Sequence, residues 1–147
     1  MRCVIQVVRQ AKCIIDEKEF SSIGKGFLLL VGFTSGDKEE TIYKVIDKIL
    51  SLRLFLDSNG KTNLSLKDVG GEVMCISQFT LYGDIKKGRR PSFTNSLNRS
   101  EAEPLYLKTI AYLNSQIKTS SGIFGADMKI ELVNDGPFTL IVDSEDL

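Results

Sequence analysis

The chain has 147 residues, of which 42% are hydrophobic and 26% are charged, values typical of one globular domain with a core of its own. Its 19 Lys and Arg residues balance 19 Asp and Glu residues, so a nucleic-acid partner would have to be met by a local basic patch. The chain has no His, which excludes Ser-His-Asp and Cys-His catalysis and His-ligated metal sites.

The cysteines and the N-terminal segment indicate a cellular location. Cys3, Cys13 and Cys75 are odd in number, far apart and flanked by apolar residues, which is typical of buried thiols in a reducing compartment. We expect no disulfide and no metal site. The N-terminus has no signal-peptide core, and no apolar run reaches membrane length, so we expect a cytoplasmic protein without a membrane partner.

The first third of the chain predicts three strands and a helix. Residues 2–8 and 12–16 are short β-rich segments, and 26–33 is a continuous apolar run between glycines, as expected of a strand buried on both faces. Apolar residues then recur at helical spacing over 37–51, with Asp37 in the first position of a capping-box pattern.

The rest of the chain predicts a second helix among further strands. The helix covers 101–118, with Ser100 and Glu103 at capping-box spacing, and Asn59-Gly60 is a turn signal. Strands are predicted at 53–56, 72–82, 123–133 and 137–143. The order β-β-β-α-β-β-α-β-β predicts one α+β domain over 1–147, with mostly antiparallel sheets curling towards a barrel and two covering helices.

The segment SQFTLYGD, at the end of the 72–82 strand, gathers several polar side chains. If 77–81 is extended, Gln78 and Thr80 share one face, where an amide and a hydroxyl could form the wall of a polar pocket. The alternative is structural, because polar side chains at strand ends commonly satisfy nearby backbone groups.

The next segment, DIKKGRRPSF, concentrates positive charge. Its cations are candidates for contacts with nucleic-acid phosphates, and such contacts carry no information about base sequence. A solvated loop is the competing interpretation. The cations are Lys86, Lys87, Arg89 and Arg90.

The segment NDGPFT, at 134–139, places Gly136-Pro137 between two apolar strand segments. One interpretation is a simple turn. The other is that Gly136 and Pro137 present bare carbonyl oxygens to a ligand, because Pro has no N–H and Gly permits close approach. Only about 5–6% of X–Pro bonds in folded proteins are cis, so the sequence alone favours trans.

These segments together resemble the D-aminoacyl-tRNA deacylase family along nearly the whole chain. The resemblance rests on SQFTL at 77–81 and the Asn-x-Gly-Pro-x-Thr pattern at 134–139. The supporting motifs are MRxVIQ, GKGFLLLVG, NLSL, GGEV, KKGRRPSF and FGADM. The resemblance implies a small α+β homodimer without a cofactor. It also implies hydrolysis of the ester that joins a D-amino acid, or sometimes glycine, to the 3′-terminal adenosine of tRNA.

The resemblance also implies roles for individual residues. Gly136-Pro137 would be a Gly-cisPro motif that enters the partner subunit's active site, holds the substrate's α-amino group and excludes an L side chain. Its neighbours Asn134 and Thr139 would support substrate binding. Catalysis would involve Ser77, Gln78, Phe79 and Thr80, with N–H groups near Phe79 and Thr80 stabilising the oxyanion.

Further roles implied by the resemblance concern the rest of the substrate. The tRNA's terminal 2′-OH would help to activate or position water. Phe79 could stack on the terminal adenine, and Met128 would lie near the same pocket. Thr80 is disfavoured as a covalent nucleophile, because no base is visible to activate its hydroxyl.

The chain departs from the family pattern at Val7. The family usually has Arg in this position, where it tethers the Gly-cisPro segment, and Val cannot donate a hydrogen bond. Arg9 lies two residues further on, where we expect the same strand face. Either Arg9 or another donor holds the loop, or the loop is looser and the chiral filter leaks.

Two other functions compete with the deacylase. A non-catalytic nucleic-acid-binding module could use the basic segment, although it would need neither SQFTL nor NDGPFT. A general hydrolase of small esters is disfavoured, because the chain has no Ser-His pair and no GxSxG motif.

Overall fold

The computed structural model describes residues 1–147. One sheet contains six of the eight strands, and two helices pack on it. The elements are β1 (Arg2–Ile15), β2 (Lys18–Ile23), β3 (Gly26–Gly32), α1 (Glu39–Ser51), β4 (Arg53–Leu56), β5 (Thr62–Ser65), β6 (Glu72–Ser77), the 3₁₀ helix η1 (Phe79–Tyr82), α2 (Arg99–Gln116), β7 (Thr119–Ser121), β8 (Lys129–Asp143) and the 3₁₀ helix η2 (Ser144–Asp146).

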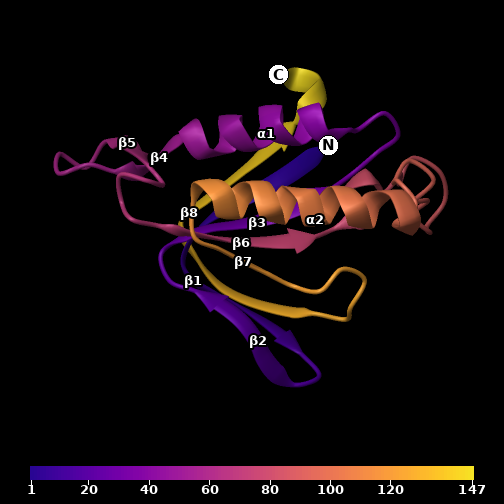
Figure 1. Cartoon of the computed structure of the whole chain (residues 1–147), viewed down its shortest axis with the longest axis horizontal. Helices are drawn as coiled ribbons and strands as arrows, with labels where there is room; N and C mark the ends of the chain where they lie inside the picture. The colour runs from indigo at the N-terminus through magenta and orange to yellow at the C-terminus, as the bar shows by residue number, and fades with distance from the viewer.

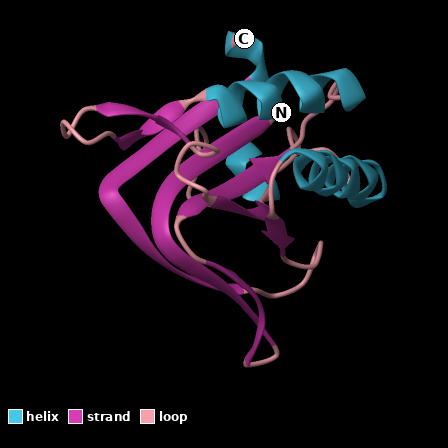
Figure 2. Cartoon of the chain, turned by 60° about the vertical axis from the view of Figure 1, so that its left-hand side comes forward, coloured by secondary structure: helices cyan, strands magenta, loops and turns pink.

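Strand β1 organises the sheet because it is long enough to take three partners. Its first half pairs with β3 and its second half with β2, while β8 pairs with β1 over most of its length. These pairings are antiparallel, and the sheet continues through the parallel neighbours β6 and β7. The strands curl strongly (Figures 1 and 2), so the predicted α+β class, with a sheet curling towards a barrel, is confirmed.

A bulge in β1 divides the interior into two cores. Val8 pairs with Asn134 and Gln10 with Val133, so Arg9 has no partner in β8 and the inward–outward alternation shifts by one residue. Val7 and Val8 face opposite cores as adjacent strand residues do, and because of the shift Ala11 and Cys13 face the smaller core together with Val8. Arg9 is exposed, so the expectation that it shares a strand face with Val7 is wrong.

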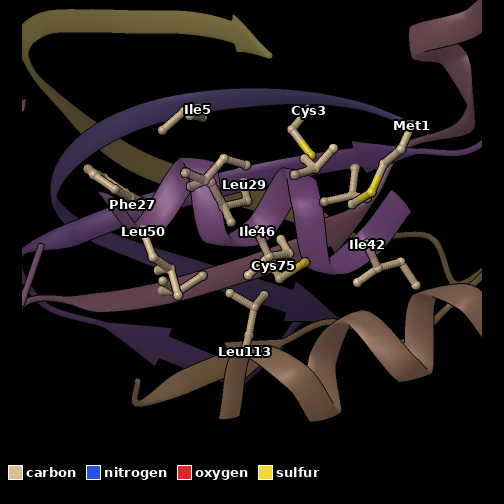
Figure 3. Close-up of a cluster of buried hydrophobic side chains, with 14 of the residues drawn as sticks. Met1, Cys3, Ile5, Phe27, Leu29, Ile42, Ile46, Leu50, Cys75 and Leu113 are labelled. Atoms are coloured by element: carbon tan, nitrogen blue, oxygen red, sulfur yellow. The ribbon is translucent and has the colours of Figure 1, made fainter. Parts of the chain in front are cut away.

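The larger core lies between the sheet and the two helices, which cover the same side of the curled sheet (Figure 1). Helix α1 contributes Ile42, Ile46 and Leu50, which meet Leu29 of β3 and Leu113 of α2 (Figure 3). Burying five such side chains provides the main driving force for docking the helices. Neither helix combines the length and apolar character that a membrane-spanning segment needs.

The predicted helices are present, but their caps differ from the prediction. Helix α1 starts after Lys38, because the Asp37 carboxylate instead accepts hydrogen bonds from the Met1 ammonium and the Thr34 N–H. Helix α2 is capped by Asn98, whose side chain accepts from the Glu101 N–H at 3.2 Å, and not by Ser100.

Several strand predictions need correction. The predicted strands at 2–8 and 12–16 are the single strand β1, and β2 was not predicted. The predicted strand at 72–82 ends at Ser77, where η1 follows. The predicted strands at 123–133 and 137–143 are the single strand β8, which starts only at Lys129, while the short β7 precedes it. Strand β5 was not predicted; it pairs with β4 across the Asn59-Gly60 turn, which is confirmed by the positive φ of Gly60 (73°).

Candidate active site

A cavity of about 530 Å³ opens where the parallel strands β3 and β6 end side by side, at Val31 and Ser77. Its walls come from the ends of these strands, the first residue of η1, the start of α2 and residues 124–128. Ten of its 16 lining residues are hydrophobic, and Arg99 and Asp127 are the charged ones. The cavity is a mostly apolar pocket with a few polar groups, as ligand sites commonly are.

The SQFTL segment turns away from the sheet at the mouth of this cavity. The Gln78 N–H makes the last ladder bond, 2.7 Å to the Val31 carbonyl, and β3 ends one residue later. The following residues have no strand to pair with, so they form η1. Gly32 leaves room for this turn, since a Cβ there would lie 2.9 Å from the Gln78 carbonyl oxygen. The prediction that 77–81 is extended is therefore wrong.

The turn exposes two backbone donors and keeps two polar side chains together. The N–H groups of Phe79 and Thr80 open η1, and neither has an acceptor in the chain. The Gln78 side-chain amide donates a hydrogen bond to the Thr80 hydroxyl. The predicted pairing of Gln78 with Thr80 thus occurs, although through a turn and not through a shared strand face.

Two contacts from distant parts of the chain hold η1 in place. The Ser96 hydroxyl donates to the Phe79 carbonyl at 2.7 Å, and the Arg2 guanidinium donates to the Leu81 carbonyl at 2.8 Å. Because two of the four carbonyls of η1, those of Phe79 and Leu81, are fixed from outside, the free N–H groups at its start have a defined direction. No acid or base contacts the Thr80 hydroxyl.

The opposite wall of the cavity comes from residues 124–128 and from Arg99. Met128 lines the cavity, as the resemblance implied. The Arg99 guanidinium lies 5.9 Å from the Phe124 ring centroid and packs against Gly125, whose φ is +75°. Sequence reasoning missed Arg99: its position at the start of a helix gives no signal, and tertiary packing alone brings it to the cavity.

Residues 84–92 form a basic loop beside the cavity, and backbone hydrogen bonds join the two ends of this loop. Asp84 and Ser92 exchange backbone hydrogen bonds of 2.7 and 2.9 Å at its base, and Gly88 at its tip has a φ of +71°. The Phe93 ring meets the Phe79 ring edge-on at 5.1 Å, which connects the loop to η1. All four predicted cations are exposed and none forms an ion pair: Lys86, Lys87, Arg89 and Arg90. In Figure 1 the loop lies at the end of the molecule opposite the β4–β5 hairpin.

The Gly136-Pro137 segment lies elsewhere on the molecule. Its peptide bond is cis, contrary to the expectation from frequency alone and in line with the resemblance. None of the residues 134–139 lines the cavity. The structure therefore brings Ser77, Gln78, Phe79 and Met128 together within one chain and leaves NDGPFT apart, as an exposed protrusion from β8.

Burial also raises the pKa values of two groups that do not line the cavity. The Tyr106 hydroxyl donates to the Cys75 carbonyl at 2.8 Å, and burial raises the pKa of Tyr106 above its ordinary range. Burial likewise raises the pKa of the Cys75 thiol well above 9.0. Neither group can supply a charged nucleophile or base near neutral pH.

The fold matches solved structures over nearly the whole chain. One is titled "c-Myc DNA Unwinding Element Binding Protein"; it has a TM-score of 0.92 and 33% identity and aligns over 97% of this chain and 98% of that one. Another is titled as a probable eukaryotic D-amino acid tRNA deacylase; its TM-score is 0.84 over 96% of this chain and 97% of that one, and its 17% identity supports likeness of fold alone.

Sequence comparison identifies the family. The model described as D-Tyr-tRNA(Tyr) deacylase matches residues 4–143. A protein named D-aminoacyl-tRNA deacylase from Dictyoglomus turgidum is 47% identical over 100% of this chain and 95% of its own length. Its namesake from Lactobacillus acidophilus is 50% identical over 97% of this chain and 99% of its own. The chain belongs to the D-aminoacyl-tRNA deacylase family, a family of ester hydrolases.

Proposed function

We propose that the protein hydrolyses the ester bond of D-aminoacyl-tRNA, and also of mischarged glycyl-tRNA, to release the amino acid and free tRNA. The observation that carries this proposal is the pair of unpartnered N–H groups of Phe79, which lines a cavity of about 530 Å³, and of Thr80, the next residue, in a chain of the deacylase family. The reaction is a chiral proofreading step of translation, and it takes place in the cytoplasm, where aminoacyl-tRNA is used.

Hydrolysis of an activated ester fits a site without His. Water adds to the ester carbonyl and loses a proton, and the carbonyl oxygen gains negative charge. The carbonyl then re-forms as the bond to the 3′ oxygen of the terminal ribose breaks, and that oxygen takes up a proton to leave as a hydroxyl. The Phe79 and Thr80 N–H groups would donate to the oxyanion, and one such donor is worth roughly 2.7–4 kcal/mol of transition-state stabilisation. The tRNA's 2′-OH would position the attacking water. Thr80 stays bonded to Gln78 and has no base beside it, which argues against a covalent intermediate.

The remaining surfaces fit the end of a tRNA. Ser77 and Met128 line the cavity, and the ring of Phe79 is 55% exposed at its mouth, where it could stack on the terminal adenine. The unpaired cations of the basic loop would contact phosphates. The contact between the Phe79 and Phe93 rings holds the basic loop next to η1.

The Gly136-Pro137 segment would complete the site across a homodimer. The segment is exposed and remote from the cavity of its own chain, so it can reach a substrate only in a second subunit. There its carbonyls would hold the α-amino group and leave no room for an L side chain. A particle of monomer mass in solution would contradict this arrangement.

Deacylation of D-Tyr-tRNA and L-Tyr-tRNA, with the wild type and the Pro137→Ala variant, tests the proposal. We expect the wild type to hydrolyse the D ester rapidly and to spare the L ester, and Pro137→Ala to lose this discrimination. Val69→Ala, remote from both segments, serves as the matched control. A wild type that hydrolyses neither ester would refute the proposed activity.

The alternative function is non-catalytic nucleic-acid binding. It is favoured by the name of the 33% identical structure, a DNA unwinding element binding protein, and by the unpaired basic loop. A steep fall of RNA or DNA affinity with salt, combined with no ester turnover, would support it. Replacing Lys86 and Arg90 by Ala should then reduce the salt slope, whereas the same change at the exposed Lys61 should not.

A further inference from the structure

The Gly136-Pro137 segment is a four-residue protrusion from an otherwise continuous strand. Thr139 pairs with Gln6 and Asn134 with Val8, so residues 135–138 leave the ladder opposite a single residue, Val7. The β1–β8 ladder resumes on both sides of the protrusion, with the bulge at Arg9 directly after the Val8–Asn134 pair. The two ends of the protrusion are therefore fixed by β1, whereas its own backbone has no strand partner.

The Asn134 side chain crosses the base of this protrusion. Its amide nitrogen donates one hydrogen bond to the Val7 carbonyl, at 2.9 Å, and another to the Phe138 carbonyl, at 3.1 Å. The Thr139 hydroxyl donates a longer bond of 3.4 Å to the Asn134 side-chain oxygen. Asn134 thus links β1 to both ends of the protrusion, and it supplies the Val7 carbonyl with the donor that the ladder lacks there.

We propose that Asn134 is the positioning residue that sets the direction of the Gly136-Pro137 carbonyls, and thereby the preference for D over L substrates. The inference rests on the proposed function. An amide group has two protons, and both are used in contacts with backbone carbonyls. Asn134 therefore acts on the substrate through the protrusion and does not bind the substrate itself.

The other side chains near the protrusion do not offer an equivalent contact. The Val7 side chain is buried in the larger core. Arg9 reaches Asp135 at 3.4 Å, but the two side chains are 72% and 42% exposed, and such exposed pairs are weak and screened by salt. The sequence left open whether Arg9 or another donor holds the protrusion. The Asn134 amide makes the closer contacts, at 2.9 and 3.1 Å, whereas Arg9 lies 3.4 Å from Asp135.

The test compares Asn134→Asp with Arg9→Gln. Asp has the shape of Asn but has no N–H to donate, and its carboxylate would face the two carbonyl oxygens. We expect the ratio of kcat/KM for D-Tyr-tRNA to that for L-Tyr-tRNA to fall at least tenfold in Asn134→Asp, mainly because the L ester is now cleaved. Arg9→Gln should keep the wild-type ratio within about threefold at any salt concentration.

A merely structural role would lower both rates or the melting temperature and leave the ratio unchanged, and that result would overturn the inference. A loss of discrimination in Arg9→Gln but not in Asn134→Asp would overturn it as well. A wild type inactive on both esters refutes the proposed function instead. Should Asn134→Asp fail to fold, exchange of the wild-type Asn134 side-chain protons by NMR decides: we expect slow exchange, and exchange at the rate of a free amide would contradict the anchor.

Discussion

Gly26 lies where β3 passes close to the backbone of β6. A Cβ at this position would be 1.8 Å from the Glu72 carbonyl oxygen, in the first pair of the parallel β3–β6 ladder. The neighbour is backbone and cannot rotate away, so the strands would have to separate. This ladder carries both strand ends that form the cavity.

We therefore expect Gly26→Ala to lower the free energy of unfolding by about 3 kcal/mol, as overpacking of a rigid site does. Gly24→Ala is the matched control, because a Cβ at Gly24 meets nothing within 4 Å and its change should stay within about 0.5 kcal/mol. Urea unfolding of both variants measures the difference. Equal midpoints would show that the two strands can move apart freely.

The buried thiol of Cys3 predicts that the free energy of unfolding depends on pH. Burial raises the pKa of Cys3 to about 12 from the ordinary value of 9.0. Between these values the unfolded chain loses the proton while the folded chain keeps it, so the free energy of unfolding should decrease as the pH rises from 9 towards 12. Cys3→Ala should show a shallower decrease over this window.

Alkylation provides a separate check on these thiols. All three cysteines are buried and free, so native protein should resist iodoacetamide, and protein in guanidinium should take up label at every cysteine. Mass spectrometry distinguishes these states. Rapid labelling of the native protein would indicate that the core around β1 opens easily.

At the scale of elements, η1 depends on the first residues of the chain. Arg2 donates to the Leu81 carbonyl at 2.8 Å and to the Asp143 carboxylate at 2.7 Å, and its guanidinium lies 4.8 Å from the Tyr82 ring centroid. One side chain thus joins β1, η1 and the end of β8. Without it, the Leu81 carbonyl would lose its fixed donor.

Arg2→Met should therefore lower kcat about tenfold at nearly constant KM, which corresponds to roughly 1.4 kcal/mol of transition-state stabilisation. The control is Lys12→Met, because the Lys12–Glu19 pair is exposed on both sides (44% and 49%). Steady-state kinetics with D-Tyr-tRNA provides the measurement. An increase in KM with unchanged kcat would instead place Arg2 in substrate binding.

Sequence patterns predicted those elements whose signals are local. The apolar periodicity of both helices depends on near neighbours, so their predicted ranges differ from the observed ones by two residues at most. The predicted cap of α1 was wrong because Asp37 is taken by the Met1 ammonium, which is 36 residues away, and the predicted cap of α2 was wrong because Asn98 takes the place of Ser100. The turn after Ser77 was not predicted for a similar reason, because it depends on where β3 ends, and β3 is distant in the sequence.

The candidate site likewise has one part that a local motif predicts and another part that depends on tertiary packing. Ser77, Gln78 and Phe79 are adjacent in sequence, and the motif identified them as a unit at the cavity. Arg99 and Phe124 meet only after α2 and the loop before β8 have packed, and no local pattern announces that contact. The bulge at Arg9 likewise depends on how β8 aligns with β1.

At the scale of the whole molecule, the proposed cross-subunit site can be tested by mixing variants. Thr80→Pro removes one oxyanion donor from the cavity, and Gly136→Val places a side chain where φ is +122°, in a region that L residues rarely adopt. Each homodimer should be inactive on D-Tyr-tRNA. Co-refolded in equal amounts, they should recover about a quarter of wild-type activity, because half of the dimers then hold one intact site of two.

Activity of the mixture no greater than the sum of the two separate variants would contradict a shared site. In that case each site would be built within one chain, and every mixed dimer would still contain two defective sites. A control mixture of Gly136→Val with the wild type should show more activity than Gly136→Val alone under either arrangement.

The pairing of β1 with β8 also has a consequence for how the protein is made. Strand β1 takes β8, the last strand of this sequence, as a partner, with contacts such as Arg2 to Asp143 that are 141 residues apart. Such long-range pairing raises the contact order and slows folding. During synthesis one edge of β1 stays open, and an open edge promotes aggregation. The β1–β8 part of the sheet can therefore close only after residue 143 has emerged from the ribosome.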